Sequence, residues 1–226
     1  MPMVAPDPTP PTGFPCGKSF LLPGPAGALE VMTNCPDAGK AIVTTAVICH
    51  PHPMQGGTMH NKVVHMLARS LGEVGLNTVR FNFRGIGASA GSFDHGNGET
   101  DDALAVLSWV RAQRPQDAIW LAGFSFGGYV AARAAHRFDV AQLVTVAPAV
   151  HLYDFASMTM PAAPWLVIQG DADEVVSAQA VQAWVQQRRP APTLVMLEGA
   201  DHFFHGRLQD LRNVIHTQFA PQPASG

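Results

Sequence analysis

One serine lies in a setting that is typical of an enzyme nucleophile. Ser125 has a glycine two positions away on each side, at Gly123 and Gly127. The apolar stretch 118–120 before it predicts a strand, and the small residues of 129–136 after it predict a helix. A strand that turns sharply into a helix holds a serine in a strained conformation with its hydroxyl exposed, and glycines avoid collisions across that turn. We therefore predict Ser125 to be an acyl-transfer nucleophile; a plain glycine-rich turn is the alternative.

A serine hydroxyl reacts at neutral pH only when a base and an orienting acid accompany it. Two later loops supply candidates, with Asp171 and Asp173 in the first and His202 and His205 in the second. Each loop follows a short apolar run that reads as a strand, and the chain order of serine, acid and histidine is the one expected in an architecture with such a strand–serine–helix turn. In this interpretation His202 removes the hydroxyl proton and Asp173 orients the imidazole.

Strand and helix signals alternate along the chain. We expect strands at 19–22, 29–32, 44–49, 78–83, before Ser125, at 142–146, 164–169 and 193–197, and helices at 61–74, 100–113, 129–136, 177–187 and 208–219. The alternation predicts an α/β fold with a mostly parallel central sheet of about eight strands and helices on both faces. The first two strands are expected to form an antiparallel hairpin that enters the sheet. We expect a proline-rich arm at 1–16, one domain at 17–220 and a tail at 221–226.

These motifs together resemble the α/β-hydrolase superfamily. Within it, the chain is similar to small lidless bacterial serine hydrolases that carry a His-Pro-His-Pro loop, which is found here at 50–53. The Arg-Gly run at 84–91, the serine turn and the acid and histidine loops complete the resemblance, which covers residues 17–219. It implies the α/β-hydrolase fold without a cap domain and the activity of a serine carboxylesterase.

The resemblance also selects between the candidate acids and bases. Family members usually place the acid three residues after a glycine and three before an apolar residue, which favours Asp173 over Asp171. The family's histidine loop favours His202, and His205 is the alternative. Asp201 is expected to be a solvated loop acid, because adjacent loop residues usually point apart.

The oxyanion of an acyl-transfer intermediate needs rigid backbone donors. We expect one donor to be the amide of Phe126, at the positive end of its helix. The second is expected from the loop after 44–49, where the two prolines have no amide hydrogen. His52 and Met54 remain, and Met54 is slightly favoured.

The connection at 147–161 is too short to build a helical lid. An open site predicts esters with small or short acyl chains, and we expect His52, Tyr153 and Phe203 to contact the substrate. A thioesterase or small peptidase with the same triad, or a non-catalytic binding module, is the alternative. An intact triad argues against the last of these.

Composition and motifs bound the partners. The chain has 226 residues, 47% of them hydrophobic, and a net charge of −3, and its fourteen Lys and Arg residues are scattered. We expect a small-molecule ester as partner, no nucleic acid, no membrane association and a cytoplasmic location. The three cysteines, Cys16, Cys35 and Cys49, are odd in number and lack paired spacing, which predicts reduced thiols.

Two further motifs are expected to carry no cofactor or metal. The run at 85–90 matches a dinucleotide fingerprint, but the glycine-rich loop 91–98 follows it where a phosphate-binding helix is needed. His50 and His52 form a His-x-His pair without a carboxylate near in the sequence, so packed or hydrogen-bonded histidines are expected there.

Overall fold

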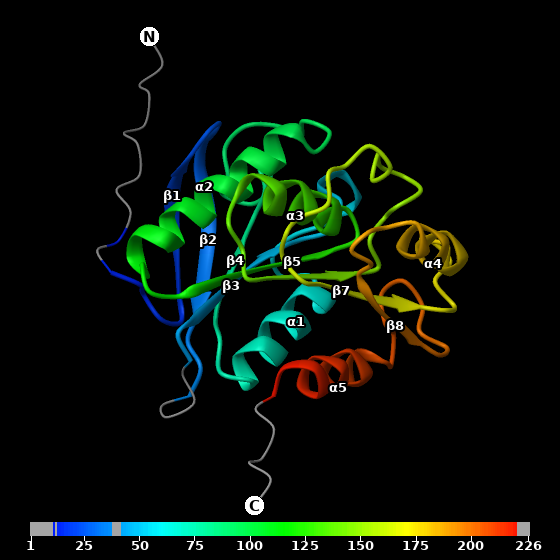
Figure 1. The fold of residues 1–226 in the computed structure, drawn as a ribbon. Coiled ribbons are helices and arrows are strands. Elements are labelled where there is room, and N and C mark those ends of the chain that lie inside the picture. Colours follow the sequence, from blue (N-terminus) through cyan, green and yellow to red (C-terminus); the bar gives the residue numbers. More distant parts are fainter. Residues whose placement is uncertain (1–10, 12, 38–41, 221–226) are drawn as a thin grey trace, which may run out of the picture.

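The computed structural model describes residues 11, 13–37 and 42–220, so the predicted tail at 221–226 and most of the predicted arm at 1–16 lie outside the described residues (Figure 1). The strands are β1 (Lys18–Gly24), β2 (Gly27–Asn34), β3 (Thr44–Cys49), β4 (Asn77–Phe81), β5 (Ala118–Phe124), β6 (Gln142–Val146), β7 (Trp165–Gly170) and β8 (Thr193–Leu197). The helices are η1 (Pro53–Gln55), α1 (Lys62–Glu73), α2 (Asn97–Gln113), α3 (Phe126–Arg137), α4 (Ala178–Gln186) and α5 (Leu208–Phe219).

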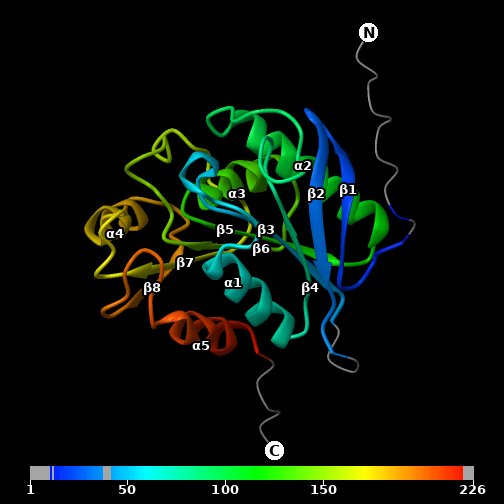
Figure 2. The ribbon, with the colours of Figure 1, turned by 180° about the vertical axis from the view of Figure 1, so that it is seen from behind.

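One sheet contains all eight strands, in the order β1-β2-β4-β3-β5-β6-β7-β8. Strands β3 to β8 are parallel, and β2 is antiparallel to both β1 and β4 (Figure 2). The predicted mostly parallel sheet entered by an antiparallel hairpin is therefore confirmed. The strand order reverses at β3, which lies between β4 and β5, and such a reversal opens a crevice at the carboxyl ends of the strands.

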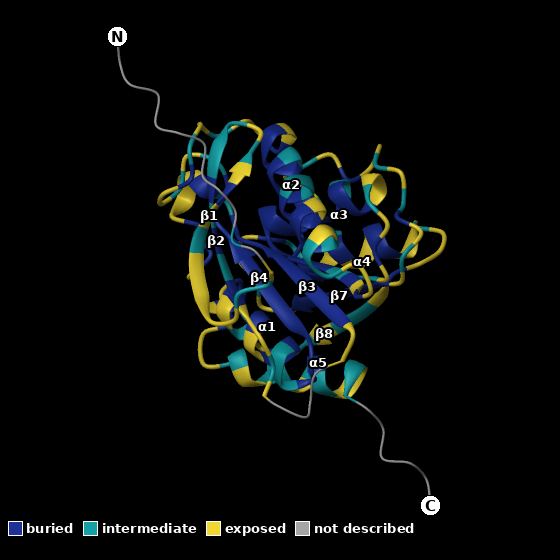
Figure 3. Ribbon diagram, turned by 90° about the vertical axis from the view of Figure 1, so that its left-hand side faces the viewer, coloured by how far each residue is buried: buried dark blue, intermediate teal, exposed yellow. Residues whose placement is uncertain are grey.

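Helices cover both faces of the sheet. Helices α2, α3 and α4 pack in one apolar layer, and α1 and α5 pack in the other (Figure 1). Figure 3 shows β3, β4 and β7 as buried strands between these layers, whereas the edge strand β8 is more exposed. Strands buried on both faces explain the nearly continuous apolar runs in the sequence. Among the described residues, none of the helices has the length and apolarity needed to cross a membrane.

The connection from β6 to β7 contains no helical insertion. All of its residues, 147–164, are described, and they form turns and bends without a helix or strand. The prediction that no cap domain is inserted here is confirmed. This segment therefore adds no helical cap at the carboxyl end of the sheet.

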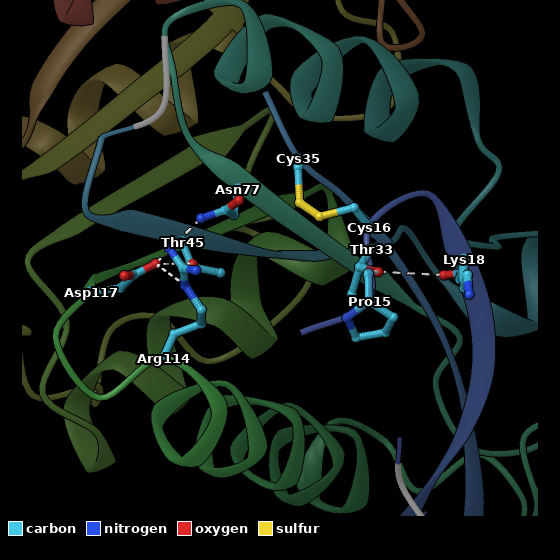
Figure 4. The surroundings of a disulfide bond; sticks show 9 residues. All are labelled: Pro15, Cys16, Lys18, Thr33, Cys35, Thr45, Asn77, Arg114 and Asp117. Carbon is cyan, nitrogen blue, oxygen red and sulfur yellow. Dashed lines mark hydrogen bonds and ion pairs between the residues drawn. A yellow bond between two sulfur atoms is a disulfide. The ribbon is translucent and has the colours of Figure 1, made fainter. Parts of the chain in front are cut away.

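The prediction of reduced thiols is wrong for two of the three cysteines. Cys16 and Cys35 form a disulfide with a Cα–Cα distance of 5.4 Å (Figure 4). The reason is the hairpin register, which pairs Lys18 with Thr33; continuing it by two residues places Cys16 opposite Cys35. Cys49 is free and buried, and burial raises the pKa of its thiol. Disulfides are uncommon in reducing compartments such as the cytoplasm, so this bond does not support the predicted cytoplasmic location, which stays a prediction.

Candidate active site

Ser125 occupies a strained turn between β5 and α3. Its backbone has φ 54° and ψ −118°, a region that L-residues rarely adopt. A Cβ atom at Gly123 would lie 2.1 Å from the carbonyl oxygen of Gly127, and one at Gly127 would lie 2.4 Å from the carbonyl oxygen of Cys49. Both glycines are therefore sterically required, as their spacing predicts. Helix α3 begins at Phe126, directly after the serine and three residues before the predicted start.

The candidate residues follow the carboxyl ends of parallel strands. Ser125 follows β5, Asp173 follows β7 and His202 follows β8. The loop after β3 meets the start of α3, because Gly127 approaches the carbonyl oxygens of Cys49 and His50 closely. The site therefore forms where the strand order reverses, at the edge of the sheet that parallel α/β proteins use for ligands.

Asp173 and His202 are in direct contact. The Oδ2 atom of Asp173 lies 2.9 Å from Nδ1 of His202, and both side chains are almost wholly buried. The same oxygen accepts a hydrogen bond of 3.0 Å from Nε2 of Gln169. The other oxygen, Oδ1, accepts from the amides of Val175 at 2.9 Å and Val176 at 2.6 Å. Four donors therefore surround this carboxylate.

The charge of Asp173 follows from these contacts. Burial would raise the pKa of the Asp173 carboxyl, but hydrogen bonds from His202, Val176 and Val175 hold this pKa below its ordinary value. The ionised carboxylate can only accept hydrogen bonds, so Nδ1 of His202 carries a proton. In the neutral ring, Nε2 is then free to accept a proton from a hydroxyl group.

The alternative acids have other partners. Asp171 is exposed and accepts a hydrogen bond of 2.6 Å from the amide of Gly199, as expected of a turn residue. Asp201 accepts from the amide of His205 at 2.9 Å and lies 2.7 Å from its Nδ1. Asp173 is thus the one of these three acids that contacts the imidazole of His202.

Aromatic packing brings the imidazole of His202 towards the serine. Its ring centroid lies 5.0 Å from that of Phe124, the residue before Ser125. Phe203 packs against the other two rings, with centroid distances of 5.0 Å to His202 and 6.2 Å to Phe124. Phe203 keeps 42% of its surface exposed, so an apolar side chain borders the site on the histidine side.

His50, the first residue of the His-Pro-His-Pro loop, is a buried structural residue. Its Nδ1 lies 2.7 Å from the carbonyl oxygen of Pro51, and its Nε2 accepts a hydrogen bond of 3.0 Å from the amide of Phe83. Burial lowers the pKa of His50 to about 3, although the contact with Pro51 opposes this shift. His50 is therefore neutral and ties the loop after β3 to the segment after β4.

This burial predicts a loss of stability in acid. In the unfolded chain His50 binds a proton below pH 6.5, whereas the folded state resists protonation down to about pH 3. The stabilising effect is therefore complete above the unfolded pKa and is lost as pH falls, by about 1.4 kcal/mol per pH unit. We expect the difference in unfolding free energy between the wild type and His50→Gln to shrink by about 2 kcal/mol from about pH 7.5 to about pH 5. Urea titrations at both pH values measure it, and a constant difference would contradict the assignment.

The two predicted oxyanion donors differ in their surroundings. Phe126 is the first residue of α3, so its amide has no acceptor within the helix. The amide of Met54 instead donates a hydrogen bond of 3.1 Å to Nδ1 of His52, and the Met54 side chain is 72% exposed. Within the described part of the chain, the amide of His52 has no hydrogen-bond acceptor.

The predicted substrate-contacting residues fall into two groups. The ring centroids of His52 and Tyr153 each lie 5.2 Å from that of Phe126, and the centroid of Phe93 lies 4.8 Å from that of His52. We call His52, Phe93, Phe126 and Tyr153 the aromatic wall. Phe203 belongs to the other group, beside His202. The residues predicted to contact the substrate therefore lie in two separate groups, one around Phe126 and one beside His202.

Two residues of the site were missed by the sequence analysis. Gln169 donates to Asp173, and a polar residue at the end of an otherwise apolar strand was the available signal. Phe93 completes the aromatic wall from a glycine-rich loop, where no periodic pattern identifies it. Across the described ranges, no three His, Cys, Asp or Glu side chains are grouped so that they could hold a metal ion.

The chain is similar to one protein family and to several known proteins. Residues 42–163, more than half of the chain, match the model of a family described as serine aminopeptidase, S33. The structure of an alpha-beta serine hydrolase homologue from Coxiella burnetii is 52% identical, with 92% of this chain and 99% of that chain covered and a TM-score of 0.89. A serine hydrolase without a lid from Xanthomonas campestris is 49% identical, with 93% and 99% covered and a TM-score of 0.88. An uncharacterized protein of Rickettsia prowazekii (strain Madrid E) is 34% identical over 206 residues, which are 85% of this chain and 84% of that protein.

Proposed function

This chain belongs to the α/β serine hydrolases of the family described as serine aminopeptidase, S33, and from that membership we propose that it is a carboxylesterase for small or short-chain acyl esters. The observation that carries the proposal is the buried contact of 2.9 Å between Asp173 and His202, at the same sheet edge as the strained Ser125. A nucleophile, a base and an orienting acid are the parts that ester hydrolysis requires.

The proposed reaction uses each group once in each half. The hydroxyl oxygen of Ser125 attacks the ester carbonyl while Nε2 of His202 takes its proton, and the ionised Asp173 stabilises the resulting imidazolium. The imidazolium then returns the proton to the leaving alcohol oxygen, which leaves an acyl-serine. Water repeats the sequence on the acyl-serine and releases the carboxylic acid.

We assign the oxyanion donors to the amides of Phe126 and His52. The contact between the Met54 amide and the His52 ring supports His52 over Met54, because a donor that already has an acceptor inside the protein is not free for the oxyanion. The His52 ring also packs on Phe126, which holds the two loops together.

An ester fits the site better than a peptide with a free amino terminus. Recognition of an ammonium group needs a carboxylate near the substrate, and the aromatic wall contains none. The nearby Glu99 accepts from the amides of Asp94 at 2.8 Å and Gly96 at 2.7 Å, and it is fully buried, so its carboxylate is not exposed to a substrate. A thioester would meet the same groups as an ester, and the experiment below separates the two.

The absence of a helical cap at the carboxyl end of the sheet predicts a preference for short acyl chains. A tail longer than the wall projects into water, so each further methylene forgoes about 0.8 kcal/mol of burial. We expect kcat/KM on a series of para-nitrophenyl esters to level off or fall beyond about four to six acyl carbons. Thioesters with the same acyl groups are the control, and higher kcat/KM values for them would replace the esterase assignment. A steady rise to long chains would contradict the open site.

A further inference from the structure

A cavity of about 430 Å³ lies between the loop after β3 and the loop after β8. The first loop and the start of α1 supply Thr58 and residues 60–63 to its wall, and the second loop and the start of α5 supply residues 203–206 and Leu208. We propose that this cavity binds the alcohol half of the ester and that Lys62 selects alcohols that carry a negative charge. This inference rests on the proposed function, whose substrate class it narrows.

The place of the cavity points to the alcohol half. Phe203, on its wall, packs against His202 and against Phe124, the neighbour of Ser125. The imidazolium must return its proton to the leaving oxygen, so the alcohol has to lie on the histidine side of the scissile bond. The cavity is on that side, and the aromatic wall is left for the acyl half.

The charge of the cavity points to an anion. No Asp or Glu is among its lining residues, and Lys62 is the lining residue with a permanent charge. Within the described residues, the exposed Lys62 side chain has no ion pair or hydrogen bond. Two acids lie two residues from lining residues: Asp201 lies 2.7 Å from Nδ1 of His205, which lines the cavity, and Asp210 forms an ion pair with Arg207.

The start of α1 does not provide the attraction by itself. The Asn61 side chain accepts hydrogen bonds from the amides of Val63 at 2.9 Å and Val64 at 3.4 Å, so the first turn is already capped. The ammonium group of Lys62 is therefore the feature that a ligand anion would meet.

The apolar lining defines the rest of the ligand. Phe203 is partly exposed and Leu208 is half-buried, so these two side chains present apolar surface near Lys62, and the buried Val63 and Phe204 lie beneath them. An aromatic ring or short alkyl spacer fits between the leaving oxygen and the anion. The class is thus an ester of a phenol or alcohol that carries a carboxylate or a phosphate beyond an apolar spacer.

The test compares two esters that differ only in charge. The wild type should hydrolyse para-acetoxyphenylacetate with a kcat/KM roughly threefold to fivefold above that of its primary amide, the size expected for a partly exposed ion pair. Lys62→Met should bring the ratio to about one, because kcat/KM should fall more for the anionic ester than for the amide, and Lys62→Arg should keep the preference. Lys18→Met is the matched control, because Lys18 is exposed on the distant edge strand β1, and it should leave the ratio unchanged. Raised salt should lower the wild-type ratio.

Two outcomes overturn the inference: a wild type that does not prefer the anionic ester, or a preference that survives in Lys62→Met. A carboxylate and a phosphate are separated by repeating the comparison with the corresponding phosphate-bearing acetate ester. If neither acetate ester is hydrolysed, the proposed function fails, and binding measurements then test whether the cavity takes an anion. Nuclear magnetic resonance titrations with para-hydroxyphenylacetate and its amide should then show tighter binding of the anion in the wild type and equal binding in Lys62→Met; equal binding in both proteins would refute the site.

Discussion

Ser125→Ala is expected to lower kcat/KM for a short-chain ester by about four to six orders of magnitude, because no covalent acyl-enzyme can form without the hydroxyl. The residual rate would come from the oxyanion donors and from substrate binding. A fluorophosphonate probe followed by peptide mass spectrometry should label Ser125 in the wild type and leave the variant unlabelled. Labelling of Ser19, Ser89 or Ser92 instead would assign the nucleophile to that serine.

The fold provides controls for this result. Ser92 is exposed in the loop before α2, so Ser92→Ala should keep full activity. The Ser125 side chain makes no capping hydrogen bond to α3, and alanine shares the strain of its positive φ, so Ser125→Ala should unfold at nearly the wild-type temperature. Ser125→Gly should be equally inactive and more stable by about 1 kcal/mol, because glycine adopts φ 54° without strain. Loss of activity with loss of folding would mean that the side chain has a structural role.

The alternation of strand and helix signals along the sequence was enough to predict the sheet and the helices that cover it. The boundaries were less accurate where tertiary contacts outweigh local preference. Helix α3 begins at Phe126, although Gly127 and Gly128 are poor helix formers. Glycine is required at 127 because a Cβ atom there would collide with the loop after β3. Helix α2 begins at Asn97, before the predicted 100, because the Glu99 carboxylate accepts a hydrogen bond from the amide of Gly96 and caps the first turn.

Contacts between distant segments were the part that the sequence could not specify. The disulfide follows from the hairpin register, and the hairpin was predicted without its register, so the pairing of Cys16 with Cys35 was missed. Spacing shows that His52 and Met54 have amide hydrogens, but it cannot show that the His52 ring turns back to accept from Met54. The first outcome depends on strand register and the second on side-chain direction, and a one-dimensional pattern contains neither.

The second large effect is expected at the acid. Asp173→Asn should lower kcat by about four orders of magnitude through the wrong tautomer of His202. The amides of Val175 and Val176 both donate to Oδ1, so an asparagine would keep its oxygen there and turn its amide nitrogen towards His202. Nδ1 of the ring would then have to accept, its proton would move to Nε2, and the base could no longer take the proton of Ser125.

Asp171→Asn is the matched control, because it makes the same chemical change two residues away. Asp171 is exposed and accepts from the amide of Gly199, a bond that the carbonyl oxygen of asparagine can also accept, so we expect less than about a threefold change in kcat. Steady-state rates on one acetate ester and thermal unfolding of both variants separate the effects. Equal losses, or a larger loss at Asp171, would transfer the acid to Asp171. A large loss confined to Asp173→Asn, in a variant that still folds, would leave Asp173 as the group that sets the tautomer of His202, since the two substitutions remove the same charge from the same loop.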